Sequence, residues 1–125
     1  MGKEELKEGF IQDPSTLEDS KESIKLPELY EWQTINLENA EEAKELSSFL
    51  SKNYLYLNAA QFINDEQAHN FLRWSLSAPK ADSQFNVGIK EIKTGKLVGF
   101  IAGLPITLNL SGDVQTMIEG KLLCV

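Results

Sequence analysis

The clearest pattern of hydrophobic and polar positions lies in the last third of the chain. From Phe85 onward, apolar residues recur at every second position, and residues 93–96 then supply a tight turn. A long apolar run continues to residue 110, a second turn occupies residues 111–113, and a further strand follows to Val125. This pattern predicts a three-stranded antiparallel meander.

Glycine and proline interrupt the middle strand of the meander at Gly99, Gly103 and Pro105. Such residues inside a strand indicate a bulge or the close approach of another backbone. A strand that is simply bent is the alternative, because glycine alone does not distinguish the two. The irregular part of the sheet is therefore expected on this middle strand.

A first helix is predicted to run from a cap at Asn39 to about Lys52. Its apolar residues recur at three- and four-residue spacing, and acids gather near its start, where the helix dipole favours them. The predicted core face consists of Ala40, Ala43, Leu46, Phe49 and Leu50.

A second helix is predicted to start after Asn64 and to end before Pro79. Its expected core face consists of Ala68, Phe71, Leu72, Ser75 and Leu76, with Trp74 at the flank. His69 lies on the polar side of this helix. We interpret it as a solvated histidine and not as a catalytic base, because no triad-type partners can be identified near it.

Two further segments complete the predicted fold. Residues 26–37 suit a strand at the edge of the sheet. Pro27 favours extended geometry at the residue that precedes it, Leu26, and Trp32 is a residue type common in strands. Residues 54–57 are expected to form a connecting loop with buried side chains. The elements together predict an α+β domain in which an edge strand and two helices precede the meander.

Charge divides the chain into two parts. The net charge of the 125 residues is −7, and residues 1–31 carry nine acids and four lysines, so this segment alone accounts for −5. We therefore expect residues 1–25 to form an acidic, flexible leader and residues 26–125 to form the folded part. The absence of a basic stripe argues against a nucleic-acid partner.

The sequence gives only indirect information about the cellular compartment and about reactive groups. Cys124 is the only cysteine, so no intrachain disulfide can form, and no apolar stretch has the length of a signal-peptide core or a membrane span. The predicted location is therefore the cytoplasm. We identify no phosphate loop, no clustered metal ligands and no Ser/His/Asp group, so local chemistry alone assigns no function.

Three stretches of the chain, taken in order, form a recognisable combination. Residues 26–32 (LPELYEW) contain a proline and end in an aromatic residue, a variable residue and Trp, residues 71–79 (FLRWSLSAP) form a helix segment ending in proline, and residues 96–105 (KLVGFIAGLP) are followed after a turn by residues 117–125 (MIEGKLLCV). In order and spacing these stretches resemble the N-myristoyltransferases, or glycylpeptide N-tetradecanoyltransferases. The corresponding family segments are a proline-containing entry segment, a Phe-Leu-x-Trp-Ala-Leu helix ending in proline, and the runs Lys-Leu-Val-Gly-Phe-Ile-Ser-Ala-Ile-Pro and Met-Val-Glu-Ile-Asn-Phe-Leu-Cys-Val.

The resemblance implies the front part of an amino-terminal lobe with an acetyltransferase-like (GNAT-type) half-fold. It also implies transfer of a myristoyl group from myristoyl-CoA to the amino-terminal glycine of a peptide or protein, with no permanently bound cofactor and no metal. The family's backbone N–H donors for the oxyanion match Leu122 and Leu123. Leu122, Leu123, Cys124 and Val125 would line the start of the acyl-CoA site.

The apolar end of the sequence, together with this resemblance, predicts a fragment that stops just before the family's cofactor loop and is inactive alone. Three departures stand out. Gly120 and Lys121 replace the family's Ile-Asn, residues 54–62 lack the acidic run used for the peptide substrate, and only Phe10 and Ile11 can be matched to the family's Phe-Trp. The alternatives are a non-catalytic binding or regulatory module derived from the fold, or a chance similarity of a generic α+β domain.

Overall fold

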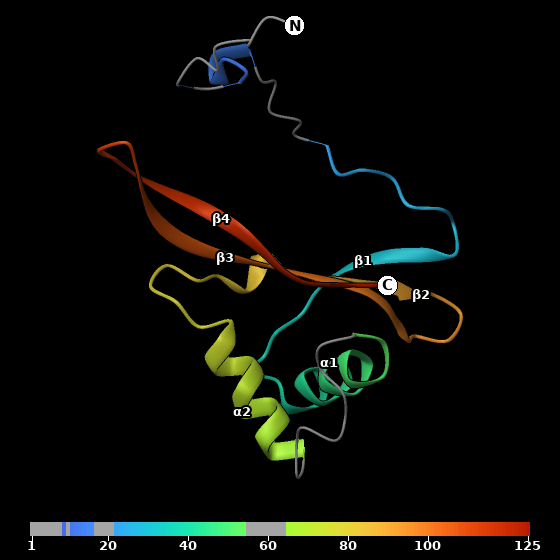
Figure 1. Cartoon of the computed structure of the whole chain (residues 1–125). Coiled ribbons are helices and arrows are strands. Elements are labelled where there is room, and N and C mark those ends of the chain that lie inside the picture. Colours follow the sequence, from blue (N-terminus) through green and yellow to red (C-terminus); the bar gives the residue numbers. More distant parts are fainter. Residues whose placement is uncertain (1–8, 10, 17–21, 55–64) are drawn as a thin grey trace, which may run out of the picture.

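Four antiparallel strands form one sheet in the computed structural model, which describes residues 9, 11–16, 22–54 and 65–125. The strand order follows the chain: β1 (Tyr30–Thr34), β2 (Asn86–Glu91), β3 (Leu97–Leu110) and β4 (Asp113–Cys124). Two helices, α1 (Ala40–Asn53) and α2 (Asp65–Ser75), lie on the same face of this sheet (Figure 1). The predicted α+β class, the edge strand and the meander are confirmed.

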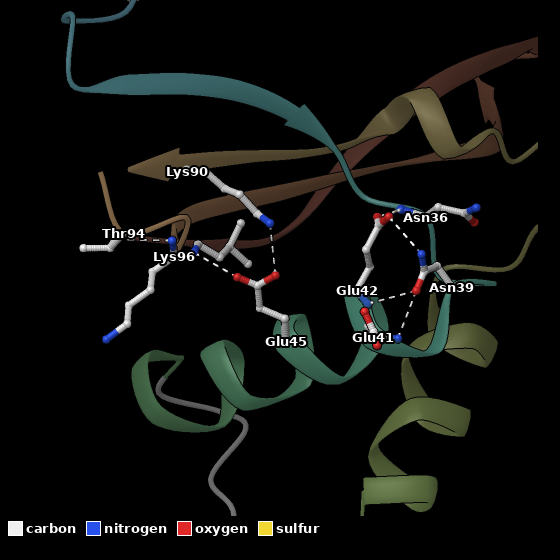
Figure 2. Close-up of polar contacts among 9 residues, drawn as sticks. Asn36, Asn39, Glu41, Glu42, Glu45, Lys90, Thr94 and Lys96 are labelled. Atoms are coloured by element: carbon white, nitrogen blue, oxygen red, sulfur yellow. Dashed lines mark hydrogen bonds and ion pairs between the residues drawn. The ribbon is translucent and has the colours of Figure 1, made fainter. Parts of the chain in front are cut away.

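The start of α1 is fixed by side chains, as the sequence predicts. The Asn39 side-chain oxygen accepts hydrogen bonds from the backbone N–H groups of Glu41 at 3.0 Å and Glu42 at 3.4 Å. The Glu42 carboxylate in turn accepts a hydrogen bond from the backbone N–H of Asn36 at 2.7 Å (Figure 2). The cap therefore ties the first turn of α1 to the chain that leaves β1.

The core lies between the helices and the sheet. The largest fully buried side chains are Ile35, Leu46 and Leu50, each no more than 1% exposed. The buried hydrophobic residues that surround them come from the segment after β1, from α1, from α2 and the residue that follows it, and from β3 and β4, namely Leu37, Ala43, Leu72, Leu76, Leu97, Phe100, Ala102 and Cys124. Burial of these residues against one another is the main stabilising contribution to the fold.

The apolar residues of β2 point away from this core. Asn86 and Gly88 are buried on the helix side, whereas Val87 and Ile89 alternate with them and are only half-buried. A Cβ atom at Gly88 would lie 2.8 Å from Leu97 Cδ1, so the core is packed against the backbone there. The side-chain alternation of this strand therefore gives the sheet a second apolar face.

The second helix agrees with its predicted face but ends earlier than Pro79 suggests. Ala68, Leu72 and Leu76 are buried, whereas Trp74 at the flank is 74% exposed. The helix proper ends at Ser75, one further bond joins the Leu76 N–H to the Leu72 carbonyl at 3.0 Å, and the chain then turns. The predicted cap, Asn64, lies outside the described residues.

The prediction of a solvated His69 is wrong. Its ring is half-buried, and Nε2 lies 2.9 Å from the backbone carbonyl oxygen of Leu37. Because a carbonyl oxygen only accepts, Nε2 carries the hydrogen and donates it. The histidine therefore joins α2 to the segment after β1, and this contact spans 32 residues of sequence.

The β2–β3 hairpin is held to α1 by Glu45. One carboxylate oxygen of Glu45 accepts a hydrogen bond from the backbone N–H of Leu97 at 3.1 Å, and the other lies 3.2 Å from Lys90 Nζ (Figure 2). The strand register shifts between Ile89 and Lys90 at this place. The glutamate therefore satisfies an amide next to an irregularity in the ladder.

The predicted irregularity of β3 is confirmed, both as a bulge and as a close approach. Ile89 pairs with Gly99 and Lys90 pairs with Leu97, so Val98 is an extra residue of β3 in the β2–β3 ladder. A Cβ atom at Gly103 would lie 2.9 Å from Ile118 Cγ2 and 3.2 Å from Phe85 Cβ, so a larger residue would force its neighbours apart. At Gly99 the nearest atoms would be at ordinary contact distance.

The far ends of β3 and β4 form a two-stranded arm. The register of β2 with β3 extends only from Lys90 to Asn86, which pairs with Ala102, whereas β3 and β4 stay paired as far as Leu110 and Asp113 (Figure 1). The turn at the tip consists of Ser111 and Gly112, with φ angles of 52° and 95°. It is two residues long and not three, because Asp113 already pairs in the ladder.

The segment before β1 meets the sheet near Trp32, whose indole N–H donates a hydrogen bond to the Ile24 carbonyl at 2.8 Å. Farther from the sheet, a short 3-10 helix, η1 (Pro14–Thr16), is present and the Ile11 side chain is fully exposed. Phe10 lies outside the described residues. No helix in the described part of the chain is both long and apolar enough to cross a membrane.

Candidate functional site

Two of the four residues that the resemblance assigns to the site, Leu122 and Leu123, lie in a bulge of β4. Phe100 pairs with Cys124 and Ala102 pairs with Lys121, so Leu122 and Leu123 together oppose the single residue Ile101. One extra residue in β4 is therefore accommodated at this point. A bulge of this kind leaves the extra residue outside the ladder and bends the strand that carries it.

The bulge forces an unusual backbone conformation on Leu122. Its φ is 56°, in the left-handed region, where a residue with a Cβ is disfavoured by about 1–2 kcal/mol. Glycine commonly occupies the left-handed position of such bulges. Because strained backbone persists only where its surroundings hold it, packing must fix this conformation, and such strain clusters at functional sites.

The side chains of the four predicted site residues alternate in their environment. Leu122 is half-buried and packs against the core, and Cys124 is buried at 6% exposure. Leu123 is 67% exposed and Val125 is 93% exposed. The two inward side chains anchor the bulge to the core, while the two outward ones leave an apolar surface beside it.

The position before the bulge shows how the departure at Lys121 is accommodated. Lys121 Nζ lies 3.6 Å from a carboxylate oxygen of Glu119, and both side chains are partly exposed. Gly120 pairs with Gly103, and a Cβ atom there would meet only Ile101 Cδ1, at 3.6 Å. Neither residue of the Gly120-Lys121 pair therefore obstructs the bulge.

Burial controls the chemistry of the thiol next to the bulge. Loss of solvent contact raises the pKa of the Cys124 thiol, because an apolar environment disfavours the thiolate. Since the thiolate is the reactive form, this cysteine is a poor nucleophile in the folded chain. Its contribution to the site is packing beside Phe100.

We expect the stability of the chain to fall at alkaline pH in part through Cys124. The folded state holds the thiol proton more tightly than the unfolded state, so this contribution is complete below the ordinary thiol pKa, about 8.5, and is lost as pH rises through the folded value. Urea unfolding between neutral pH and about pH 10 should show a steeper decline for the original chain than for Cys124→Ser. Parallel declines of the two proteins would contradict this assignment.

The structure describes only parts of the other segments that the resemblance singles out. Residues 55–62, where the family's peptide-contacting run would lie, are outside the described residues, and Tyr54 itself is half-buried against the core. Of the pair matched to the family's Phe-Trp, only Ile11 is described, and its full exposure means that it does not anchor the leader to the sheet.

The sequence reading located Leu122 and Leu123 through resemblance but did not predict the bulge. The irregularity predicted for the glycine-containing strand is present at Val98, but the second register shift, in the β3–β4 ladder, adds its extra residue to β4 and was not predicted. The one sequence feature that could have indicated the bulge is the pair of consecutive leucines, since two adjacent apolar residues break the period-two alternation of a strand. The left-handed backbone of Leu122 cannot be recognised from its residue type.

A four-stranded antiparallel sheet with two helices on one face is the arrangement of the first part of an acetyltransferase-like acyltransferase. The model of the Myristoyl-CoA:protein N-myristoyltransferase N-terminal domain matches residues 10–125. The chain therefore belongs to the N-myristoyltransferase family, as the resemblance implied.

Relatives and solved structures agree with this assignment. The chain is 32% identical over 120 residues to the glycylpeptide N-tetradecanoyltransferase of Dictyostelium discoideum, covering 96% of the chain and 29% of that protein. It is 38% identical over 100 residues to the glycylpeptide N-tetradecanoyltransferase of Drosophila melanogaster, covering 80% of the chain and 21% of that protein. A crystal structure of Saccharomyces cerevisiae N-myristoyltransferase with bound myristoyl-CoA superposes with a TM-score of 0.71 at 28% identity, covering 85% of the chain and 24% of that structure. The chain thus spans less than a third of each of these proteins.

Proposed function

We propose that this chain forms the first part of the acyl-CoA site of an enzyme that moves a myristoyl group from myristoyl-CoA to the amino-terminal glycine of a peptide or protein. In this proposal residues 1–25 are a leader and residues 26–125 are part of the acyl-CoA-binding lobe. The observation that supports it is the strained bulge at Leu122 and Leu123, the pair that we match by sequence to the family's oxyanion donors.

The reaction is attack of an amine on a thioester. The amine nitrogen forms a bond to the carbonyl carbon, the carbonyl electron pair moves to oxygen, and collapse of this intermediate breaks the C–S bond. The CoA thiolate leaves, and the amine loses its proton. The oxygen is negatively charged only in the intermediate, so donors aimed at that position accelerate the reaction.

Backbone N–H groups suit this role because they are fixed before the substrate arrives. A bulge takes a residue out of the ladder, so the backbone N–H of that residue can donate a hydrogen bond to a ligand instead of to a neighbouring strand. We assign the donors to the N–H groups of Leu122 and Leu123. The neighbouring Cys124 is buried and Val125 is exposed, and we assign these four residues together to the start of the acyl-CoA site.

Binding of myristoyl-CoA to the chain tests the proposal. We expect myristoyl-CoA to raise the melting temperature, because a ligand that binds only the folded state stabilises it. Free CoA and free myristate, each at the same concentration, should do so less, since each carries only part of the ligand. Equal effects of all three, or no shift with myristoyl-CoA up to its limit of solubility, would refute the assignment of these residues to an acyl-CoA site.

A further inference from the structure

The arm has a free edge on the side of β3 that faces away from β4. β2 pairs with β3 only as far as Ala102, and beyond that residue no strand in the described part of the chain lies beside β3 on this side (Figure 1). On the other side β4 stays paired to Leu110. An unpaired strand edge offers a row of backbone N–H and C=O groups to another strand.

Backbone groups of an antiparallel strand alternate between its two neighbours, and one hydrogen bond in the sheet sets the phase of this alternation. The Ile35 N–H donates to the Asn86 carbonyl at 2.8 Å, so the backbone groups of Asn86 face β1. The next residue, Val87, therefore directs its N–H and C=O groups to its β3 partner, Ile101. Ile101 accordingly directs its own backbone groups to the β2 side of β3.

The same alternation continues to the tip of β3, because its ladder with β4 has no register shift beyond residue 102. At two-residue steps from Ile101 it brings Pro105, Thr107 and Asn109 to the free edge. Pro105 agrees with this phase, since a proline has no N–H and is tolerated where that group would face an open edge. Thr107 and Asn109 thus each present one N–H and one C=O outward.

The side chains along this edge follow a symmetric pattern. Ile106, Leu108 and Leu110 share one face of β3, whereas Thr107 and Asn109 share the other. The order of apolar and polar positions is the same in both directions from Leu108. A second copy of the chain that pairs antiparallel at Leu108 therefore sets apolar residues opposite apolar ones and polar residues opposite polar ones.

The apolar side chains of the arm edge continue a strip that begins in the core. Exposure rises along this strip, from 0% at Ala102 and 8% at Leu104 to 38% at Leu108 and 47% at Leu110. No charged residue occurs from residue 97 to residue 112. Natural edge strands commonly carry charges, lysine above all, which prevent pairing with another chain, and this edge lacks that protection.

We propose that two copies of this chain pair antiparallel through residues 106–110 of β3, with a two-fold axis at Leu108. Thr107 of each copy then lies opposite Asn109 of the other, and the two residues exchange N–H···O=C hydrogen bonds. The two Leu108 side chains meet at the axis, where a non-hydrogen-bonded pair brings side chains closest together. The contact is closed, because each copy covers the free edge of the other. This proposal does not rest on acyl transfer.

Sedimentation equilibrium of the chain, from low micromolar to submillimolar concentration, tests the proposal. We expect a monomer–dimer equilibrium described by one dissociation constant. Leu108→Lys sets two like charges directly opposite each other at the axis and should weaken dimerisation by at least about tenfold. The matched control is Val114→Lys, which adds the same charge on β4 at a side chain that is 68% exposed, and it should leave the dissociation constant unchanged.

Thr107→Pro separates pairing from folding. It removes an N–H that faces the free edge, so the monomer should keep its circular dichroism spectrum while dimerisation weakens. A chain that stays monomeric throughout, a dimer that Leu108→Lys and Thr107→Pro leave unchanged, or growth beyond the dimer would each overturn the proposal. Loss of the dimer in Val114→Lys but not in Leu108→Lys would place the contact on the outer edge of β4 and would overturn it as well.

Discussion

Replacing Leu123 with proline should slow acyl transfer by about 10²–10³-fold, the usual effect of removing one oxyanion donor. Proline has no backbone N–H, and it forces the preceding residue towards extended geometry, which conflicts with the φ of 56° at Leu122. Both consequences act on the amides that we assign to the oxyanion. The rate is best measured in a chimaera in which this chain replaces the matching quarter of the S. cerevisiae enzyme.

The control for this experiment is Leu123→Ala, which keeps the N–H and shortens a side chain that is 67% exposed. We expect the alanine chimaera to retain most of the rate of the unsubstituted chimaera. Thermal melting of all three proteins separates loss of donors from loss of fold. A proline chimaera that is folded and as fast as the alanine one would remove Leu122 and Leu123 from the mechanism.

Replacing Glu45 with alanine should lower the free energy of unfolding by about 2–3 kcal/mol. The Leu97 N–H would lose its acceptor while Leu97 remains buried, and an unsatisfied buried donor costs about 1–3 kcal/mol. Lys90 would also lose the carboxylate that now lies 3.2 Å away, while its side chain stays only 21% exposed. Urea unfolding monitored by circular dichroism measures the change.

Two other glutamate variants show which part of the contact matters. Glu45→Gln keeps an oxygen acceptor for Leu97 and loses only the ion pair, so it should cost less than the alanine variant. Glu41→Ala removes an exposed carboxylate from the first turn of the same helix and should change stability by less than about 1 kcal/mol. Equal losses in Glu45→Ala and Glu41→Ala would contradict the role given to Glu45.

The sequence predicted well those elements whose cause is local. Asn39 caps α1 through contacts two and three residues away, and the buried positions Leu46 and Leu50 follow helical spacing. Period-two alternation likewise located β2, and the short turns separated the strands of the meander. Signals of this kind act within one element and are visible in a single stretch of sequence.

Features that depend on contacts between distant segments were missed. The hydrogen bond of His69 to the Leu37 carbonyl joins residues 32 positions apart, so its helix face alone suggested exposure to solvent. The bulge at Leu122 is likewise set by the register of two strands and by core packing, not by the intrinsic preference of leucine. The candidate site could therefore be located only by family resemblance, and its geometry required the fold.

The arm formed by the outer halves of β3 and β4 has a consequence for cooperativity. A two-stranded ribbon is only marginally stable alone, and the arm residues from Thr107 to Leu110 are exposed. Phe100 and Cys124, at the other end of the same pair of strands, are buried in the core. One hairpin therefore spans two regimes of amide hydrogen exchange: local opening can release the tip, while the bulge stays ordered until the whole core unfolds.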